Sequence, residues 1–275
     1  MTQGPPQKTT LLFTLRVTAM DFIYVWLMIC FLRLFVVENY RVPTGSMTPT
    51  LVGGTIAQLD VNQDGLSDYV LRMGRGYEIF INAGQDFLPC TDYPPSPQFK
   101  MELEALRKSH DDNALPEAFF SWLSPLELRK EAEARLRTRY DNILVDKTRY
   151  WFASPQRGDI AVFKPPRSIY QRTAPVYVKR VVGLPGETAQ VRDNHLWVDG
   201  KPVASPEFFR RHYYTNVCEG RLFTGQTQGS DEYLFFGDNT LNSSDGRYWG
   251  PVPRDNIRGK VFFRYWPLKA GGFVR

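Results

Sequence analysis

The segment VPTGSMTPTL, residues 42–51, contains a serine that could act as a nucleophile. Ser46 follows Gly45, which permits backbone angles that other residues avoid. Pro43 and Pro49 stiffen the chain on either side, so a rigid turn could present the hydroxyl of Ser46. Exposed loop serines are common, and a nucleophilic serine also needs a base.

A lysine can be that base if burial lowers its pKa, because desolvation penalises the ammonium form. The candidate is Lys179 in APVYVKRVVGLPGET, whereas none of the three histidines has an informative context. In a strand, Lys179 and Arg180 point to opposite faces, and the neighbouring valines can surround the amine. The alternative is an ordinary lysine of an edge strand.

A third polar segment is FFGDNTLNSSDGRYWGPVP, residues 235–253, which follows an apolar strand. Its hydroxyls, carboxylates and arginine could orient a catalytic amine and brace the site with an Asp–Arg pair. Taken alone, the segment could equally be a surface turn with a solvated salt bridge.

A fourth segment, LDVNQDGLSDYVL, carries oxygen ligands at alternate positions: Asp60, Asn62, Asp64 and Asp68. Such side chains around a glycine turn can wrap one calcium ion. The glutamate expected at the twelfth loop position is replaced by Leu71. The loop 60–68 is therefore a candidate calcium site, and a polar turn without metal is the alternative.

Composition and motifs exclude several classes of protein. With 43% hydrophobic and 23% charged residues, the chain is not wholly disordered. Three cysteines without a C-x-x-C pair exclude a zinc ribbon, and the sequence has no H-E-x-x-H, P-loop or dinucleotide fingerprint. The net charge of +5 is scattered, and we predict no nucleic-acid partner.

These polar segments follow an apolar stretch. Residues 22–37 read FIYVWLMICFLRLFVV, with Arg33 as the only charge, and the stretch extends back to residue 11. We interpret residues 11–38 as a single uncleaved membrane anchor after a cytoplasmic tail of residues 1–10. No small-residue cleavage site follows, which disfavours a signal peptide, whereas a buried core helix remains an alternative.

The rest of the chain predicts a mainly β domain with a partly helical insertion. Short strands are expected at residues 159–163, 176–182, 232–236 and 259–265, with a hairpin over 189–198 that turns at Asp193-Asn194. This pattern is typical of antiparallel sheets or a barrel. Residues 52–139 interrupt it, and helices are expected at 99–110 and 116–140.

The polar segments, in this order after one anchor, resemble bacterial type I signal peptidases, the membrane-bound Ser–Lys endopeptidases of family S26. The resemblance covers residues 11–51 and 140–266, including GSMTPTL, NILVDKTRYWFASPQRGDIAVFKPP, YVKRVVGLPGE and GDNTLNSSDGRYWGPVP. It implies a largely β catalytic domain formed by residues 40–51 and 140–275, and it assigns no role to the insertion 52–139.

The resemblance also implies roles for individual residues. Ser46 would be the acylated nucleophile and Lys179 its general base, without a cofactor. The backbone N–H of Ser46 and the hydroxyl of Thr44 would form the oxyanion hole. The supporting residues would be Ser243, which orients the lysine, with Asp238, Asp245 and Arg247. Thr240, Leu241 and Gly246 depart from the family pattern within this polar network.

The implied function is removal of signal peptides after an A-x-A-like site. The enzyme would lie in the bacterial inner membrane, with its N-terminus cytoplasmic and its catalytic domain periplasmic. Its expected partners are preprotein signal peptides, membrane lipid and the secretion machinery. The alternatives are a processing peptidase with a narrow client, such as a pilus or conjugation protein, and a non-catalytic membrane-anchored binding module. Cys90 and Cys218 could form a disulfide or remain thiols.

Overall fold

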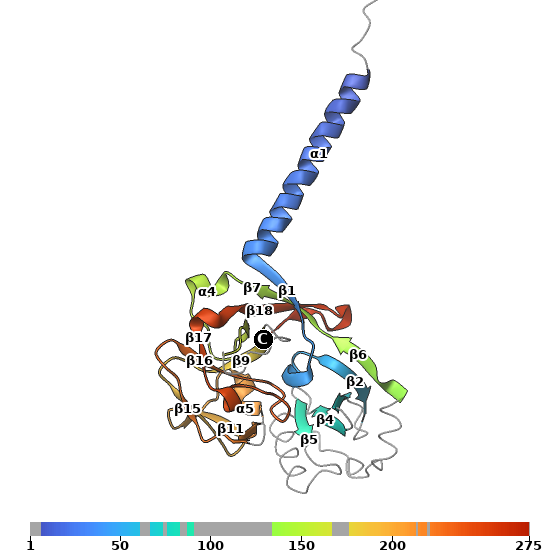
Figure 1. The fold of residues 1–275 in the computed structure, drawn as a ribbon. Helices are drawn as coiled ribbons and strands as arrows, with labels where there is room; N and C mark the ends of the chain where they lie inside the picture. The colour runs from blue at the N-terminus through green and yellow to red at the C-terminus, as the bar shows by residue number, and fades with distance from the viewer. Residues whose placement is uncertain are drawn as a thin grey trace, which may run out of the picture.

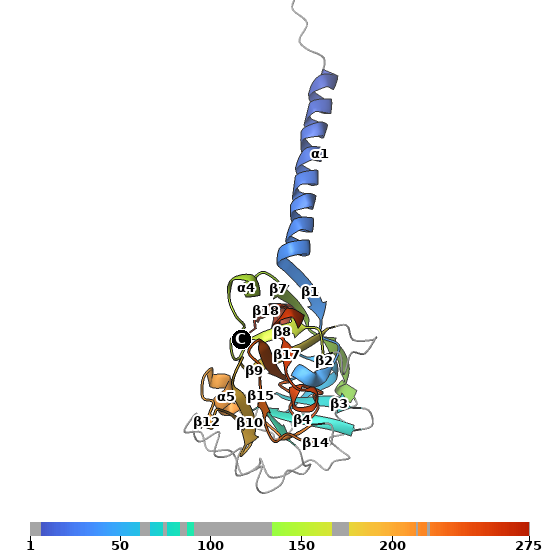
Figure 2. The ribbon, with the colours of Figure 1, turned by 60° about the vertical axis from the view of Figure 1, so that its left-hand side comes forward.

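The computed structural model describes residues 7–60, 67–73, 76–82, 87–90, 134–166, 176–212, 214–218 and 221–274. Helix α1, Gln7–Phe31, continues into a π-helical turn, η1, Leu32–Val36, and stands away from a body built of β-strands (Figures 1 and 2). The body also contains short helical turns between its strands: η2 Gly45–Met47, α4 Arg149–Phe152, α5 Glu207–Arg211, α6 Gly246–Trp249, η5 Arg254–Asn256 and η6 Leu268–Ala270.

The N-terminal helix is long and apolar enough to cross a membrane. The candidate span is Phe13–Val36, 24 residues with a mean hydropathy of 2.0, and none of it is buried against the rest of the protein. A core helix of a globular domain would be mostly covered, so this exposure argues against the core-helix alternative. The helix therefore suggests a single-pass membrane anchor.

The largest sheet has eight antiparallel strands. Its order is β1 (Val37–Arg41), β7 (Asn142–Asp146), β18 (Ile257–Trp266), β8 (Ile160–Phe163), β9 (Tyr177–Gly183), β16 (Glu232–Phe236) and β17 (Val252–Pro253), with β19 (Gly272–Phe273) added to β18. Strand β18 shifts register against both neighbours, an irregularity that bends a sheet. All four strands predicted in this part of the chain are confirmed, within a few residues at their ends.

A smaller sheet lies beside the first and contains the predicted hairpin. Its order is β12 (Lys201–Pro202), β11 (His195–Val198), β10 (Thr188–Arg192) and β15 (Gln226–Thr227). Asp193 and Asn194 have φ of 49° and 60°, the backbone geometry of a tight hairpin turn. A two-stranded ribbon, β13 (Val217–Cys218) with β14 (Arg221–Leu222), lies near α6.

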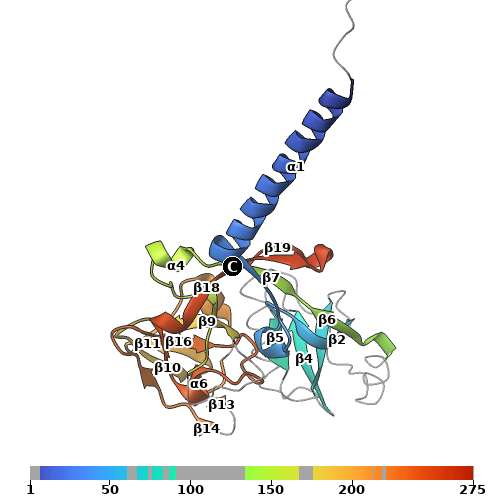
Figure 3. The same ribbon diagram turned by 45° about the horizontal axis from the view of Figure 1, so that its top comes forward.

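The described part of the insertion is a five-stranded sheet that the sequence analysis did not predict (Figure 3). Its order is β5 (Phe87–Cys90), β4 (Gly76–Asn82), β3 (Asp68–Met73), β2 (Gly53–Leu59) and β6 (Arg137–Tyr140). Val52, Ile56, Leu71 and Phe80 form its small core.

The predicted helix over residues 116–140 is wrong at its C-terminal end, where β6 is a strand paired with β2. The local sequence favours a helix, but the ladder from Gly53↔Tyr140 to Ile56↔Arg137 overrides that preference. The other predicted helix, residues 99–110, lies outside the described residues, as does the first part of 116–140.

Candidate active site

Three kinds of contact hold the turn that carries Ser46: a hydrogen bond within the turn, the burial of Met47 and a hydrogen bond from Asn239. Residues Gly45–Met47 form a single 3-10 turn, closed by the N–H of Thr48 donating to the carbonyl of Gly45 at 2.9 Å. Met47 is buried in the core of the main sheet. Asn239, from the third polar segment, donates its backbone N–H to the carbonyl of Ser46 at 3.0 Å. The segment around residue 239 therefore holds the serine turn directly.

Lys179 approaches this turn from strand β9. Its Nζ lies 2.5 Å from Ser46 Oγ, and the lysine is 4% exposed. Burial lowers the pKa of Lys179 to about 8, although the negative charges of Asp245 and Asp238 oppose the shift. The two predicted reactive groups are thus in hydrogen-bond contact, and about a tenth of the amines are neutral at pH 7, compared with under a thousandth for a lysine of ordinary pKa 10.5.

This pKa predicts the pH dependence of cleavage. A base must be unprotonated to accept the hydroxyl proton, so kcat/KM should rise with pH up to about 8 and level off above it. Below the pKa, the rate should fall about tenfold per pH unit. The measurement is kcat/KM for a peptide substrate from about pH 6 to about pH 10. A rate that stays flat on the acid side would contradict a lysine base.

Asp245 and Arg247 form the Asp–Arg pair expected in the third polar segment. Arg247 donates Nε and Nη2 to the two carboxylate oxygens of Asp245 at 2.9 and 2.8 Å. The carboxylate also accepts the N–H of Gly237 at 2.9 Å and, as the N-cap of α6, the N–H of Arg247 at 3.1 Å. Both side chains are fully buried, so the pair ties the loop together inside the protein rather than at its surface.

Asp238 makes a different pair, which the sequence analysis missed. Arg180 donates Nε and Nη2 to its carboxylate at 2.9 and 2.7 Å, and Nη1 to the carbonyl of Gly158 at 2.8 Å. Burial alone would raise the pKa of Asp238, but the charge and hydrogen bonds of Arg180 outweigh it and lower that pKa. The available signal was strand alternation, which sends Arg180 away from the face of Lys179.

The two expected hydroxyl groups lie beside the serine. Thr44 Oγ1 is 3.4 Å from Ser46 Oγ. Ser243 Oγ is buried and has no hydrogen-bond partner among the described residues. It packs against Gly237, where an added Cβ would also meet the carbonyl of Ser46 at 2.5 Å. The orienting role of Ser243 and the oxyanion role of Thr44 stay predictions.

Two departures from the family pattern fit their surroundings. Thr240 Oγ1 accepts Nη1 of Arg247 at 2.9 Å and the N–H of Thr215 at 2.8 Å, so this residue belongs to the polar network. A Cβ at Gly246 would meet Leu234 Cδ1 at 2.7 Å and the carbonyl of Phe235 at 2.8 Å. A serine has no room at position 246 in this arrangement.

The candidate calcium loop is only partly described. Asn62 and Asp64 lie outside the described residues. Asp68 is buried, and its Oδ1 accepts the N–H of Asn82 at 2.7 Å, while Asp60 directly follows strand β2. Among the described residues, no group of three or more His, Cys, Asp or Glu side chains could hold a metal ion. Calcium therefore stays a prediction.

The proposed cysteine pairing also stays open. Cys218 is buried near the third polar segment, with its Sγ 3.1 Å from the carbonyl of Ser243. Cys90 ends strand β5, but the position of its side chain is outside what the structure describes.

Comparison with known proteins gives one consistent family. The profile described as "Signal peptidase, peptidase S26" matches residues 120–266, just over half of the 275-residue chain. Signal peptidase I of Leptolyngbya laminosa is 36% identical over 135 residues, which cover 48% of this chain and 63% of that protein. Signal peptidase I of Bacillus caldolyticus is 37% identical over 140 residues, covering 48% and 72%.

The chain spans about three fifths of the length of the first curated relatives it matches. A crystal structure of signal peptidase I from Enterococcus faecalis V583 is 29% identical, with a TM-score of 0.30, and covers 39% of this chain and 97% of that one. The profile match includes Lys179 and the third polar segment. On the extent of that match and the relatives above 30% identity, the chain belongs to the signal peptidase S26 family.

Proposed function

We propose that this protein is a Ser–Lys endopeptidase that removes signal peptides from exported preproteins. The observation that carries the proposal is the 2.5 Å contact between Ser46 Oγ and the buried amine of Lys179. A lysine with a pKa of about 8 can serve as a base near neutral pH, whereas an exposed lysine cannot.

The reaction would follow from the positions of these groups. Neutral Lys179 accepts the hydroxyl proton while Ser46 Oγ attacks the scissile carbonyl carbon. The N–H of Ser46 and the hydroxyl of Thr44 donate to the oxyanion that forms. The lysine ammonium then protonates the leaving amine, and the peptide bond breaks to give an acyl-enzyme. Water, deprotonated by the same lysine, hydrolyses the ester and restores Ser46.

The carboxylates behind the lysine support this cycle. Asp245 and Asp238 both raise the pKa of Lys179, which means that they stabilise the ammonium formed in the transition state. Each carboxylate is also held by a buried arginine, so it keeps its position while the lysine changes charge. The lysine can therefore pick up and release a proton without rearrangement of its surroundings.

The proposed substrates are preproteins with small residues in an A-x-A-like cleavage site. Ser46 follows the candidate span by ten positions, so the site would lie close to the membrane surface, where such a cleavage site emerges. We place the N-terminus in the cytoplasm and the catalytic domain on the outer side of a bacterial inner membrane. Membrane lipid and the secretion machinery are the further proposed partners.

We propose the same division of the chain as the sequence analysis: residues 40–51 and 140–275 as the catalytic domain and 52–139 as an insertion. The separate sheet formed by β2 to β6 supports this division. A structural calcium ion in loop 60–68 is a secondary part of the proposal, and no step of the reaction depends on it.

The test is cleavage of a preprotein carrying an A-x-A site, with the purified protein in detergent. We expect cleavage at that site, and no cleavage of a matched preprotein in which each of the two alanines is replaced by tryptophan. The product's N-terminal sequence identifies the bond. If correctly folded protein leaves the A-x-A preprotein intact, the broad signal-peptidase proposal fails and a narrow-client enzyme or a binding module takes its place.

A further inference from the structure

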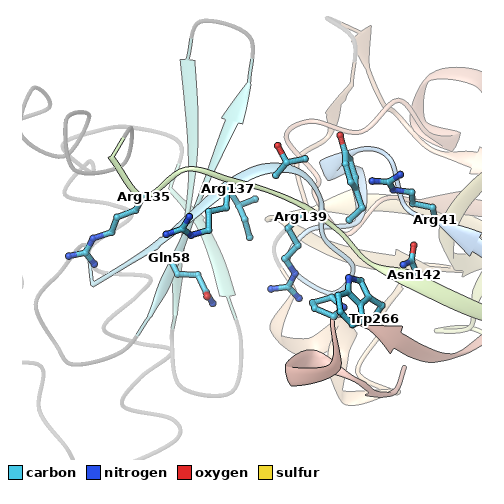
Figure 4. Close-up of a pocket in the computed structure, with 11 residues that line it drawn as sticks. Arg41, Gln58, Arg135, Arg137, Arg139, Asn142 and Trp266 are labelled. Atoms are coloured by element: carbon cyan, nitrogen blue, oxygen red, sulfur yellow. The ribbon is translucent and has the colours of Figure 1, made fainter.

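A basic groove lies between the insertion sheet and the end of the main sheet (Figure 4). Its volume is about 750 Å³. One wall is the edge strand β6 with the neighbouring β2, and the other is the end of β18 with Arg41 of β1. Among the described residues, four arginines line it, Arg41, Arg135, Arg137 and Arg139, and none of the described lining residues is acidic. Neither Ser46 nor Lys179 contributes to it, so the groove is not the catalytic site.

The positive charge of the groove is only partly neutralised. Arg139 donates to Asp141 at 3.0 Å, but Arg264 donates to the same carboxylate, so one negative charge serves two arginines. Within the described residues, Arg41 and Arg137 form no ion pair. The guanidinium of Arg41 lies 4.0 Å from the ring centre of Tyr140, which holds it at the wall of the groove. The groove therefore matches an anionic ligand.

The shape of the groove selects among anionic ligands. Strand β6 is the outermost described strand of its sheet, and an edge strand offers backbone N–H and C=O groups to a further strand. Arg135, Arg137 and Arg139 follow at two-residue intervals along the chain toward Trp266 (Figure 4). Arg137 and Arg139 lie within β6, where this interval is about 6.6 Å, the same as the spacing of alternate side chains in a paired strand.

We propose that this groove binds an extended acidic peptide segment, which adds as a strand to β6. Carboxylates at alternate positions of the peptide meet Arg137, Arg139 and Arg41, because a guanidinium matches a carboxylate in shape and charge. Trp266, which is 51% exposed at the rim, offers apolar contact beside them. A lipid headgroup would use the charge but would not need the strand edge or the regular spacing.

The test measures binding to the full-length Ser46→Ala protein in neutral detergent, so that no peptide is cleaved. The probe is a fluorescein-labelled peptide of about eight residues with Glu at alternate positions, long enough to pass three arginines. We expect micromolar affinity that weakens with salt, and no binding of a matched peptide with Gln in place of Glu. Because cleavage plays no part, failure of the peptidase proposal would leave this result unchanged.

Substitutions locate the site. Arg41→Gln and Arg137→Gln should each weaken binding about fivefold to tenfold, since each removes one charged hydrogen-bonding partner. Arg192→Gln, an exposed arginine on the smaller sheet, removes the same charge and should leave affinity unchanged. Arg41 and Arg137 are exposed, so the variants should melt with the parent protein.

Three results would overturn the proposal. Equal affinity for the Glu and Gln peptides would show that the negative charge of the peptide does not contribute to binding. Unchanged binding in the double variant Arg41→Gln with Arg137→Gln would place the peptide elsewhere. Displacement of the peptide by phosphatidylglycerol, but not by phosphatidylcholine, in mixed micelles would make the groove a lipid-headgroup site instead.

Discussion

Ser46→Ala and Lys179→Ala are each expected to lower kcat for preprotein cleavage by a factor of about 10⁴ or more. The first change removes the proposed nucleophile, and the second removes the proposed base, whose Nζ lies 2.5 Å from Ser46 Oγ. Because the two groups act as one unit, the double variant should be no slower than either single variant. Single-turnover cleavage of the A-x-A preprotein, followed by gel or mass spectrometry, measures all three rates.

Lys201→Ala is the control for a lost lysine, because Lys201 is an exposed residue of β12 on the smaller sheet. It should cleave at the parent rate. All variants should keep the parent melting temperature to within about 4 °C, since truncating the lysine removes a desolvated amine and a modest amount of apolar contact. Rapid turnover by Lys179→Ala, with the same pH profile as the parent, would show that another group is the base.

Ser46 and Lys179 are 133 positions apart, and their contact could be predicted because the separate segments together resemble the signal peptidases. Ser46 lies on a turn bounded by glycine and prolines, and Lys179 lies in an apolar strand, so each segment describes its own environment. The Asp245–Arg247 pair joins residues only two positions apart, and the hairpin at Asp193-Asn194 is encoded in its two turn residues. Such features need no knowledge of distant partners.

The features that were missed depend on distant partners. Arg180 and Asp238 are 58 positions apart, and strand alternation indicates the face that Arg180 takes but not the residue it pairs with. Strand β6 reads RTRY at the end of a charged, helix-like stretch and becomes a strand because β2 pairs with it. The arginine groove has the same origin, because its walls come from β1, β2, β6 and the end of β18.

The second large effect concerns stability. Asp245→Ala is expected to lower the free energy of unfolding by about 3–5 kcal/mol, since it leaves a buried arginine without its counter-charge. The carboxylate accepts from Arg247 Nε and Nη2 and from the N–H of Gly237, and all of these donors would lose their partner inside the protein. For a chain of this size the loss corresponds to about 10 °C in melting temperature, measurable by near-ultraviolet circular dichroism in detergent.

Glu207→Ala gives the matched control, because Glu207 and Arg210 form an exposed pair whose side chains are 59% and 58% accessible. Its loss should change stability by less than about 1 kcal/mol, since solvent and salt screen a surface pair. Asp245→Asn keeps the size of the side chain but removes its negative charge. Its free energy of unfolding should therefore lie between those of Asp245→Ala and the parent protein. If Asp245→Ala has the same melting temperature as the Glu207→Ala control, water or another acceptor must bind the Arg247 guanidinium in that variant. In that case the pair would not be what holds the segment after β16 against the serine turn, and the hydrogen bonds from Asn239 to the carbonyls of Ser46 and Gly45 would hold it instead.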